Sequence, residues 1–235
     1  MQDCYAGDIG DYGKLGLLRC LAQKGLIIGV NWYKVVPDQP PKNNDGGYGI
    51  PLRFDVCDPI LAQGLRTVFG AADRSISLLM DGNWIRNAVY YDADLSHTDR
   101  ALWHDYALRV LKSCDAVFLD PDNGLIVPSA TRKTRHKYVL DYEIGDYIRR
   151  GQSVILYNHR PRKQADAYFS EMWERLAAIE GVKPTHISYM TFPRCSVRDY
   201  FMIAANDEHR RIFQDTITDM LSGVWGRVGM CRVET

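Results

Sequence analysis

Short apolar, β-branched runs alternate with longer segments of helical periodicity along most of the chain. The apolar runs predict strands, and the segments whose apolar residues recur every three or four positions predict helices. The predicted strands are residues 26–36, 87–91, 115–120, 152–159, 184–192 and 198–206, and the predicted helices are 14–24, 58–69, 97–113, 137–151, 165–181 and 207–223. This alternation predicts an α/β fold: a three-layer, mostly parallel open sheet with a C-terminal antiparallel strand pair.

The length of 235 residues suits a single α/β catalytic domain over residues 1–235. The 29 basic and 29 acidic residues cancel, so any nucleic-acid contact must come from a local basic patch. The sequence shows no signal peptide, no long apolar stretch and no cysteine spacing typical of zinc sites. We therefore expect a cytoplasmic protein that has no membrane partner and needs no metal or cofactor. Residues 37–51, rich in Pro, Asn and Gly, predict a long surface loop.

Residues 116–127, AVFLDPDNGLIV, place two carboxylates and an amide at the end of an apolar strand. The PDNG residues also favour a tight turn, so a purely structural role for Asp122 and Asn123 stays open. Asp120 is harder to explain in that way. A carboxylate at the end of a buried strand costs free energy, unless it is ion-paired, hydrogen-bonded or used in the function of the protein. We interpret Asp120, Asp122 and Asn123 as candidate catalytic residues.

A second polar segment, YNHRPRK at residues 157–163, follows the strand predicted at 152–159. Ligands of open parallel sheets bind at the carboxyl ends of the strands, so this segment and the DPDNG loop should meet at one edge. The pKa of histidine lies near neutrality, which suits His159 to proton transfer or to stabilising a leaving group. Asn158, Arg160 and Arg162 are candidates for substrate binding, although Arg162 also fits a solvated basic face.

The opening segment GDIGDYGK predicts a glycine- and aspartate-rich loop at residues 7–13, in which Asp8, Asp11 and Lys14 are candidates for substrate contact. Its spacing matches neither a dinucleotide-binding motif nor a P-loop, and helix capping by the aspartates is an equal alternative.

The run TRKTRHKY at residues 131–138 adds a basic patch, which suits a polyanionic substrate such as DNA. Trp32 and Tyr33 lie toward the end of the first predicted strand and could stack an extruded base there, unless they pack in the core.

Three reactions fit these residues. Methyl transfer from S-adenosylmethionine suits the strand order and a DPP-like site, but the glycine-rich turn expected after the first strand is missing. Metal-dependent phosphoryl chemistry suits the D-x-D spacing of Asp120 and Asp122, which in that class normally lies on the first strand. Hydrolysis of an N-glycosidic bond needs a carboxylate for the water and the cationic sugar, and a group that stabilises the departing base. A module that only binds is the non-enzyme alternative.

The loops LDPDNG and NHRP, in this order, resemble those of uracil-type DNA glycosylases, which carry an acidic D-P loop and a later His-Pro loop on a small α/β sheet. Here Arg160 separates His159 from Pro161. The blocks GDIGDYGKLGLLR, NWY, VFLDPDNG, KYVLDYE and YNHRPR, within residues 7–162, also resemble a mostly uncharacterised bacterial group that has members in phage-defence loci. These resemblances imply nucleic-acid chemistry and a glycosylase that flips and removes a modified base.

We therefore expect a DNA glycosylase with defined roles for these side chains. Asp120 or Asp122 supports the water and the cationic sugar, and His159 stabilises the leaving base. Asn123 and Asn158 orient the base, and Trp32 or Tyr33 stacks on it. The residues expected to hold phosphates are Lys14, Arg160 and Arg162.

Overall fold

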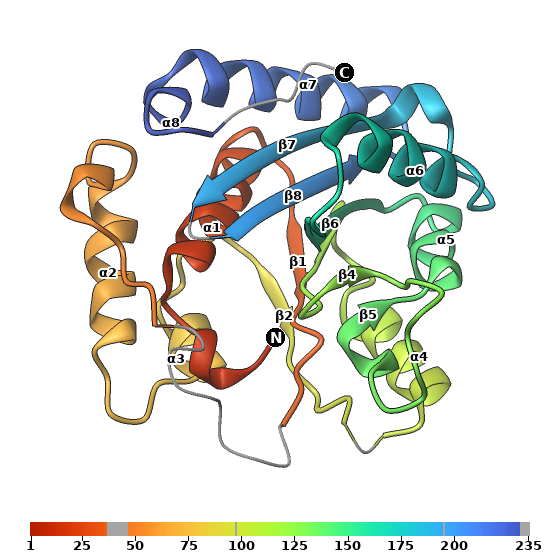
Figure 1. Cartoon of the computed structure of the whole chain (residues 1–235), viewed down its shortest axis with the longest axis horizontal. Coiled ribbons are helices and arrows are strands. Elements are labelled where there is room, and N and C mark those ends of the chain that lie inside the picture. The colour runs from red at the N-terminus through yellow and green to blue at the C-terminus, as the bar shows by residue number, and fades with distance from the viewer. Residues whose placement is uncertain (37–46, 97, 195, 231–235) are drawn as a thin grey trace.

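The structure, a computed structural model, describes residues 1–36, 47–96, 98–194 and 196–230. Six strands form one sheet in the order β2-β1-β3-β6-β8-β7 (Figure 1). The strands are β1 (Ile28–Asn31), β2 (Val89–Tyr91), β3 (Ala116–Leu119), β6 (Ser153–His159), β7 (Ile187–Arg194) and β8 (Ser196–Ile203). Neighbours among β2, β1, β3 and β6 pair in parallel, whereas β8 is antiparallel to both β6 and β7. The predicted α/β class, mostly parallel sheet and C-terminal antiparallel pair are confirmed.

Helices cover both faces of the sheet (Figure 1). One face carries α1 (Ile9–Gln23), α2 (Pro59–Phe69), α3 (Ile76–Asp81), α7 (Asp207–Ser222) and α8 (Val224–Arg227). The other face carries α4 (Arg100–Val110), α5 (Asp141–Arg149) and α6 (Ala165–Ala177). Successive strand side chains point to opposite faces, so in β3 Phe118 packs into the first core and Val117 into the second. Burial on both faces explains why β3 is apolar at every position.

The sheet register brings the ends of three strands to one edge. Leu119, the last residue of β3, pairs with Asn31 of β1 and with Leu156 of β6. Beyond this row the backbone amide of Asp120 donates to the carbonyl of Asn31 at 2.9 Å. The residue after β3 therefore lies beside β1 and opposite the last residues of β6.

Three local predictions need correction. Residues 9–13, predicted as loop, belong to α1, because the Asp8 side chain accepts from the backbone amide of Asp11 and starts the helix earlier. The first strand is only Ile28–Asn31, since Tyr33 adopts a positive φ of 45° that a strand cannot continue through. The helix predicted from 137 starts at Asp141.

Two short strands explain that later start. Residues Tyr138–Val139 form β5 and pair in parallel with β4, Gly124–Leu125. Of the loop predicted at 37–51, residues 37–46 lie outside the described residues. Among the described residues, no helix has the length and apolar character needed to cross a membrane.

Candidate active site

A pocket of about 320 Å³ opens where α1, the loop after β3 and the end of β6 meet. Seven residues predicted from the sequence line it: Asp8, Asp11, Lys14, Asp120, Asp122, Asn123 and His159. The first three lie more than a hundred positions before the other four in the chain. The fold thus gathers most of the predicted site around one hollow.

Direct contacts join the DPDNG loop to the segment after β6. The backbone amide of His159 donates to the carbonyl of Asn123 at 2.9 Å, and the Asn158 side-chain oxygen accepts from the amide of Leu125 at 2.9 Å. The amide of Asn123 donates to the carbonyl of Lys137 at 3.0 Å, which adds the basic segment 131–137 to the same edge. The predicted meeting of these segments is confirmed.

Lys14 is the centre of a buried charge cluster at the floor of the pocket. Its Nζ lies 2.7 Å from Oδ2 of Asp120 and 2.9 Å from Oδ1 of Asp11. Burial raises the pKa of Asp120, and Lys14 opposes that rise. Burial disfavours the ammonium, but the two carboxylates raise the pKa of Lys14 and keep it charged. Lys14 is therefore ion-paired with both Asp11 and Asp120, while the expectation that it holds phosphates stays a prediction.

Asp122 is held by the first two residues of the chain. Its Oδ1 lies 2.9 Å from the amino group of Met1, and its Oδ2 accepts from Nε2 of Gln2 at 2.7 Å. Burial favours protonation, but the Met1 ammonium and the Gln2 amide outweigh it and lower the pKa of Asp122. Both carboxylates of the DPDNG loop are therefore ion-paired, each with a different ammonium group.

Asp8 differs from these two carboxylates. Its Oδ1 caps α1 by accepting from the amide of Asp11 at 2.9 Å, while its Oδ2 lies 3.7 Å from a guanidinium nitrogen of Arg198. The residue is only 7% exposed. Burial and the nearby Asp11 carboxylate raise the pKa of Asp8 to about 6. Asp8 is thus a pocket carboxyl that changes protonation near neutral pH, which is the behaviour expected of a general acid or base.

Arg198, which the sequence interpretation overlooked, completes the wall opposite α1. Its guanidinium donates to the carbonyls of Arg194 at 2.5 Å and Ser196 at 3.3 Å. Gly10 makes room for it, because a Cβ there would lie 2.6 Å from Arg198 Nε. No local sequence signal marks Arg198, because its place directly opposite His159 depends on the antiparallel pairing of β8 with β6.

His159 and Tyr157 form an aromatic wall of the pocket. Their rings stack with centroids 6.4 Å apart and an interplanar angle of 23°. Burial and the neighbouring Arg198 charge lower the pKa of His159, so the imidazole is neutral at physiological pH. A neutral imidazole can donate one hydrogen bond to a bound group and accept another. Tyr157 was not predicted as a site residue.

Other predicted site residues lie elsewhere. Trp32 and Tyr33 are fully buried, so the expected base stacking is corrected to core packing. Arg160 forms a bidentate ion pair with Asp199 at 2.9 and 2.5 Å, which replaces the expected phosphate contact. Arg162 is exposed and is not among the residues that line this pocket.

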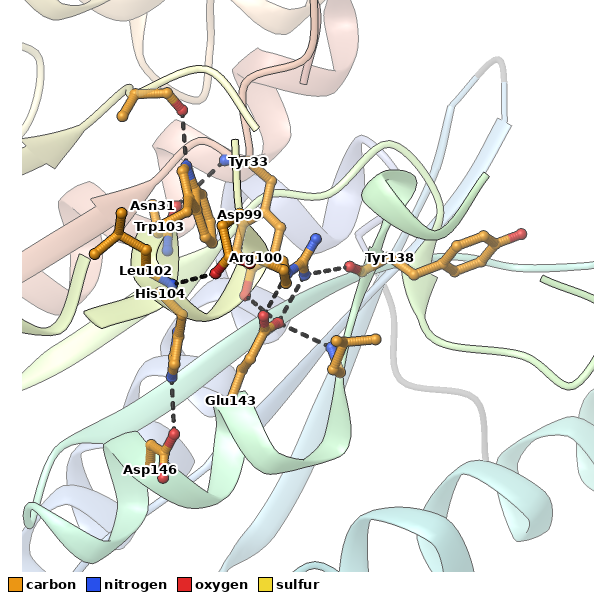
Figure 2. Close-up of polar contacts among 12 residues, drawn as sticks. Asn31, Tyr33, Asp99, Arg100, Leu102, Trp103, His104, Tyr138, Glu143 and Asp146 are labelled. Atoms are coloured by element: carbon orange, nitrogen blue, oxygen red, sulfur yellow. Dashed lines mark hydrogen bonds and ion pairs between the residues drawn. The ribbon is translucent and has the colours of Figure 1, made fainter. Parts of the chain in front are cut away.

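Tyr33 belongs instead to a buried polar network between β1, α4 and α5 (Figure 2). Its hydroxyl donates to Oε2 of Glu143 at 3.0 Å, and Arg100 binds both oxygens of the same carboxylate at 2.5 and 2.8 Å. Arg100 also donates to the carbonyl of Tyr138 at 2.8 Å. The network therefore fixes the backbone of β5 beside the DPDNG loop.

Gly124 is the residue that lets the two loops approach each other. It has a φ of +125°, and a Cβ there would lie 1.9 Å from Oδ1 and 3.0 Å from the Cα of Asn158. We expect Gly124→Ala to lower the unfolding free energy by about 2–4 kcal/mol, through backbone strain and the displaced Asn158. Urea denaturation followed by circular dichroism measures this.

Gly25→Ala is the matched control. Gly25 has a similar φ of +99°, but a Cβ there would meet no described side chain or backbone group within 4 Å. The Gly25→Ala substitution should lower the unfolding free energy by only about 1 kcal/mol. Equal losses in the two variants would contradict the importance of the Gly124–Asn158 contact.

The pocket therefore combines a carboxyl that titrates near neutrality, a fixed guanidinium, a neutral imidazole and an aromatic wall. Such groups can activate a water molecule and stabilise a departing planar group. Comparison with protein-family models and with curated proteins finds no match for this chain. The geometry of the pocket is thus the basis for a functional proposal.

Proposed function

We propose that this chain is a DNA glycosylase that hydrolyses the N-glycosidic bond of a modified nucleobase, with a role in defence against phages. The observation that carries the hydrolytic proposal is Asp8, whose pKa of about 6 places a titrating carboxyl in the pocket beside Arg198 and His159. The defence role and the modified base depend on the sequence resemblance.

The reaction assigns a step to each group. Ionised Asp8 accepts a proton from water while the water oxygen bonds to C1′ of the sugar. The C1′–N bond breaks, and its electron pair moves onto the departing base. Arg198 and the N–H of neutral His159 stabilise the negative charge on the base, which takes up the proton that Asp8 accepted and leaves, so that Asp8 is ionised again. The carboxylate also offsets the positive charge that develops on the sugar.

This proposal moves the catalytic carboxylate from the DPDNG loop to α1. Asp120 and Asp122 are each bonded to an ammonium group, so neither is available as a base without breaking a buried ion pair. We assign them to the support of the pocket. Asn123 also lines the pocket and stays a candidate for orienting the base.

DNA as the substrate is supported by the charge around the pocket. The basic segment 131–137 adjoins the loop after β3 through the hydrogen bond from the amide of Asn123 to the carbonyl of Lys137, and Lys137 lines the pocket itself. Positive side chains beside a reactive pocket favour binding of a phosphate backbone. The proposed substrate is therefore a DNA strand from which one base is extruded.

Methyl transfer from S-adenosylmethionine is the second candidate, favoured by one observation. The sheet ends in an antiparallel pair, as the strand order from the sequence suggested, and the reversed strand β8 lies between β6 and β7. In place of a glycine-rich turn, β1 is followed by the buried Trp32 and Tyr33. Calorimetric binding of S-adenosylmethionine would support this candidate over hydrolysis.

The third candidate, metal-dependent phosphoryl transfer, needs Asp120 and Asp122 to share a metal ion. The described part of the chain holds no cluster of three or more His, Cys, Asp or Glu side chains arranged for a metal. The two carboxylates instead bind separate ammonium groups. We therefore do not favour this candidate.

Alkaline cleavage tests the proposed reaction. We expect the protein, incubated with a panel of modified phage DNAs, to produce strand breaks that arise only after treatment with hot alkali, since alkali cleaves abasic sites. Free base should be recovered by chromatography in equal amount. Plain DNA is the control for modification, and His159→Ala should slow base release while DNA affinity remains. DNA binding without any base release would favour the binding-only alternative.

A further inference from the structure

A second pocket, of about 530 Å³, lies on the other side of the loop after β3, against α6. Asn123 and His159 line both pockets. The two hollows are therefore neighbours, separated by a ridge that these two residues form. Both volumes lie within or near the usual range for ligand pockets, about 300–1,000 Å³.

Hydrogen bonds hold the ridge in place. The amide of His159 donates to the carbonyl of Asn123, and Asn158 bonds through its oxygen to the amide of Leu125. The amide nitrogen of Asn158 donates to the hydroxyl of Tyr168 at 2.7 Å. Because the ridge is tied to both β4 and α6, the two pockets stay separate.

The lining of the second pocket suits a nucleotide. Leu125 and Met172 give it an apolar floor, and Tyr138 contributes a half-buried ring. Lys163 and Glu171 form an exposed ion pair of 2.6 Å at its edge. Exposed pairs contribute little stability, so a phosphate can replace Glu171 as the partner of Lys163. A flat apolar surface beside a cation matches a base and its phosphate.

Tyr138 is presented to this pocket by the buried network in Figure 2. Arg100, itself bound to Glu143, donates to the Tyr138 carbonyl at 2.8 Å. Figure 2 shows the Tyr138 ring pointing away from the Arg100–Glu143 pair. The backbone of Tyr138 is thus fixed while its ring remains available to a ligand.

We propose that the second pocket binds the nucleotide adjacent to the target nucleotide, with its base against Tyr138. The inference rests on the proposed function of the first pocket. Two consecutive bases cannot stay stacked on each other when the Asn123–His159 ridge lies between them. The substrate is therefore a single-stranded or locally melted DNA segment that presents two unstacked neighbouring nucleotides.

Calorimetric binding of two probes tests this inference. We expect 5′-phosphorylated dithymidylate to bind at least about 10-fold more tightly than thymidine 5′-monophosphate, because base–aromatic stacking adds affinity for each base held. Tyr138→Ala should remove this gain, so that the two probes then bind with similar affinity. Tyr138→Phe should retain it, since the ring is kept.

Tyr106→Ala is the matched control. Tyr106 is an exposed tyrosine of α4 that lines neither pocket, so its removal should leave both affinities unchanged. Equal affinity of the wild type for the two probes, no binding of either, or a dinucleotide gain that persists in Tyr138→Ala overturns the inference.

Base release is measured separately and distinguishes the two proposals. If abasic sites form but the dinucleotide binds no more tightly than the mononucleotide, only the proposal for the second pocket is overturned. If the dinucleotide binds more tightly in a way that depends on Tyr138 but no abasic sites form, the proposed glycosylase activity is overturned and the proposal of two adjacent nucleotide pockets stands.

Discussion

The Asp8→Asn variant is expected to lose at least about 100-fold in the rate of base release, the usual contribution of a general base. Asparagine keeps an oxygen that can cap α1 but cannot accept a proton from water. In the wild type, the rate should rise with pH through about 6, as Asp8 ionises. The measurement is single-turnover base release between about pH 5 and pH 8.

The same variant is expected to be more stable at neutral pH. The folded-state pKa of Asp8 is raised from 3.8 to about 6, so the folded protein holds this proton more tightly than the unfolded chain. The wild type therefore loses stability from this group as pH rises from about 4 to 6. Removing the buried charge should increase the unfolding free energy above pH 6 by about 2–3 kcal/mol, and the difference should vanish below about pH 4.

Asp99→Asn is the matched control for the effect of Asp8→Asn on base release. Asp99 caps α4 by accepting from the amide of Leu102 at 3.0 Å, the same role that Asp8 has in α1, but it is exposed and lines neither pocket. It should leave base release unchanged. Full activity in Asp8→Asn would contradict the catalytic role of Asp8.

Lys14→Met is expected to lower the unfolding free energy at pH 7 by about 3–5 kcal/mol, because it leaves buried carboxylates without their cation. The side chains of Lys14 and Asp120 are 5% and 2% exposed, and Asp11 shares the same ammonium. Adding Asp120→Asn should recover part of the loss, since one uncompensated charge is then removed. Urea denaturation of both variants measures the effect.

Lys24→Met provides the comparison. The Lys24–Asp219 ion pair has a similar length of 2.6 Å, but its side chains are 31% and 66% exposed. Solvent screens such a pair, so the loss should stay below about 1 kcal/mol. Similar losses in Lys14→Met and Lys24→Met would show that the buried cluster does not hold the pocket together.

The site residues show how far prediction from the sequence reaches. Asp120 and His159 could be placed at one sheet edge, because each directly follows an apolar run and parallel strands end together. Arg198 could not, because its position depends on β8 running antiparallel beside β6. The sequence also could not decide whether Trp32 lies in a binding surface or in the core, since an aromatic residue after a strand suits either place.

The sequence by itself determined the α/β class, the antiparallel end of the sheet and the meeting of the DPDNG and NHRP segments. Each follows from local periodicity and from the rule that parallel strands share an edge. The tertiary structure alone decided how each carboxyl of the pocket is paired. Charge pairing depends on distances of a few ångströms between distant segments: Lys14 reaches Asp120, Met1 reaches Asp122, and Asp8, with a pKa raised to about 6, lies beside Arg198.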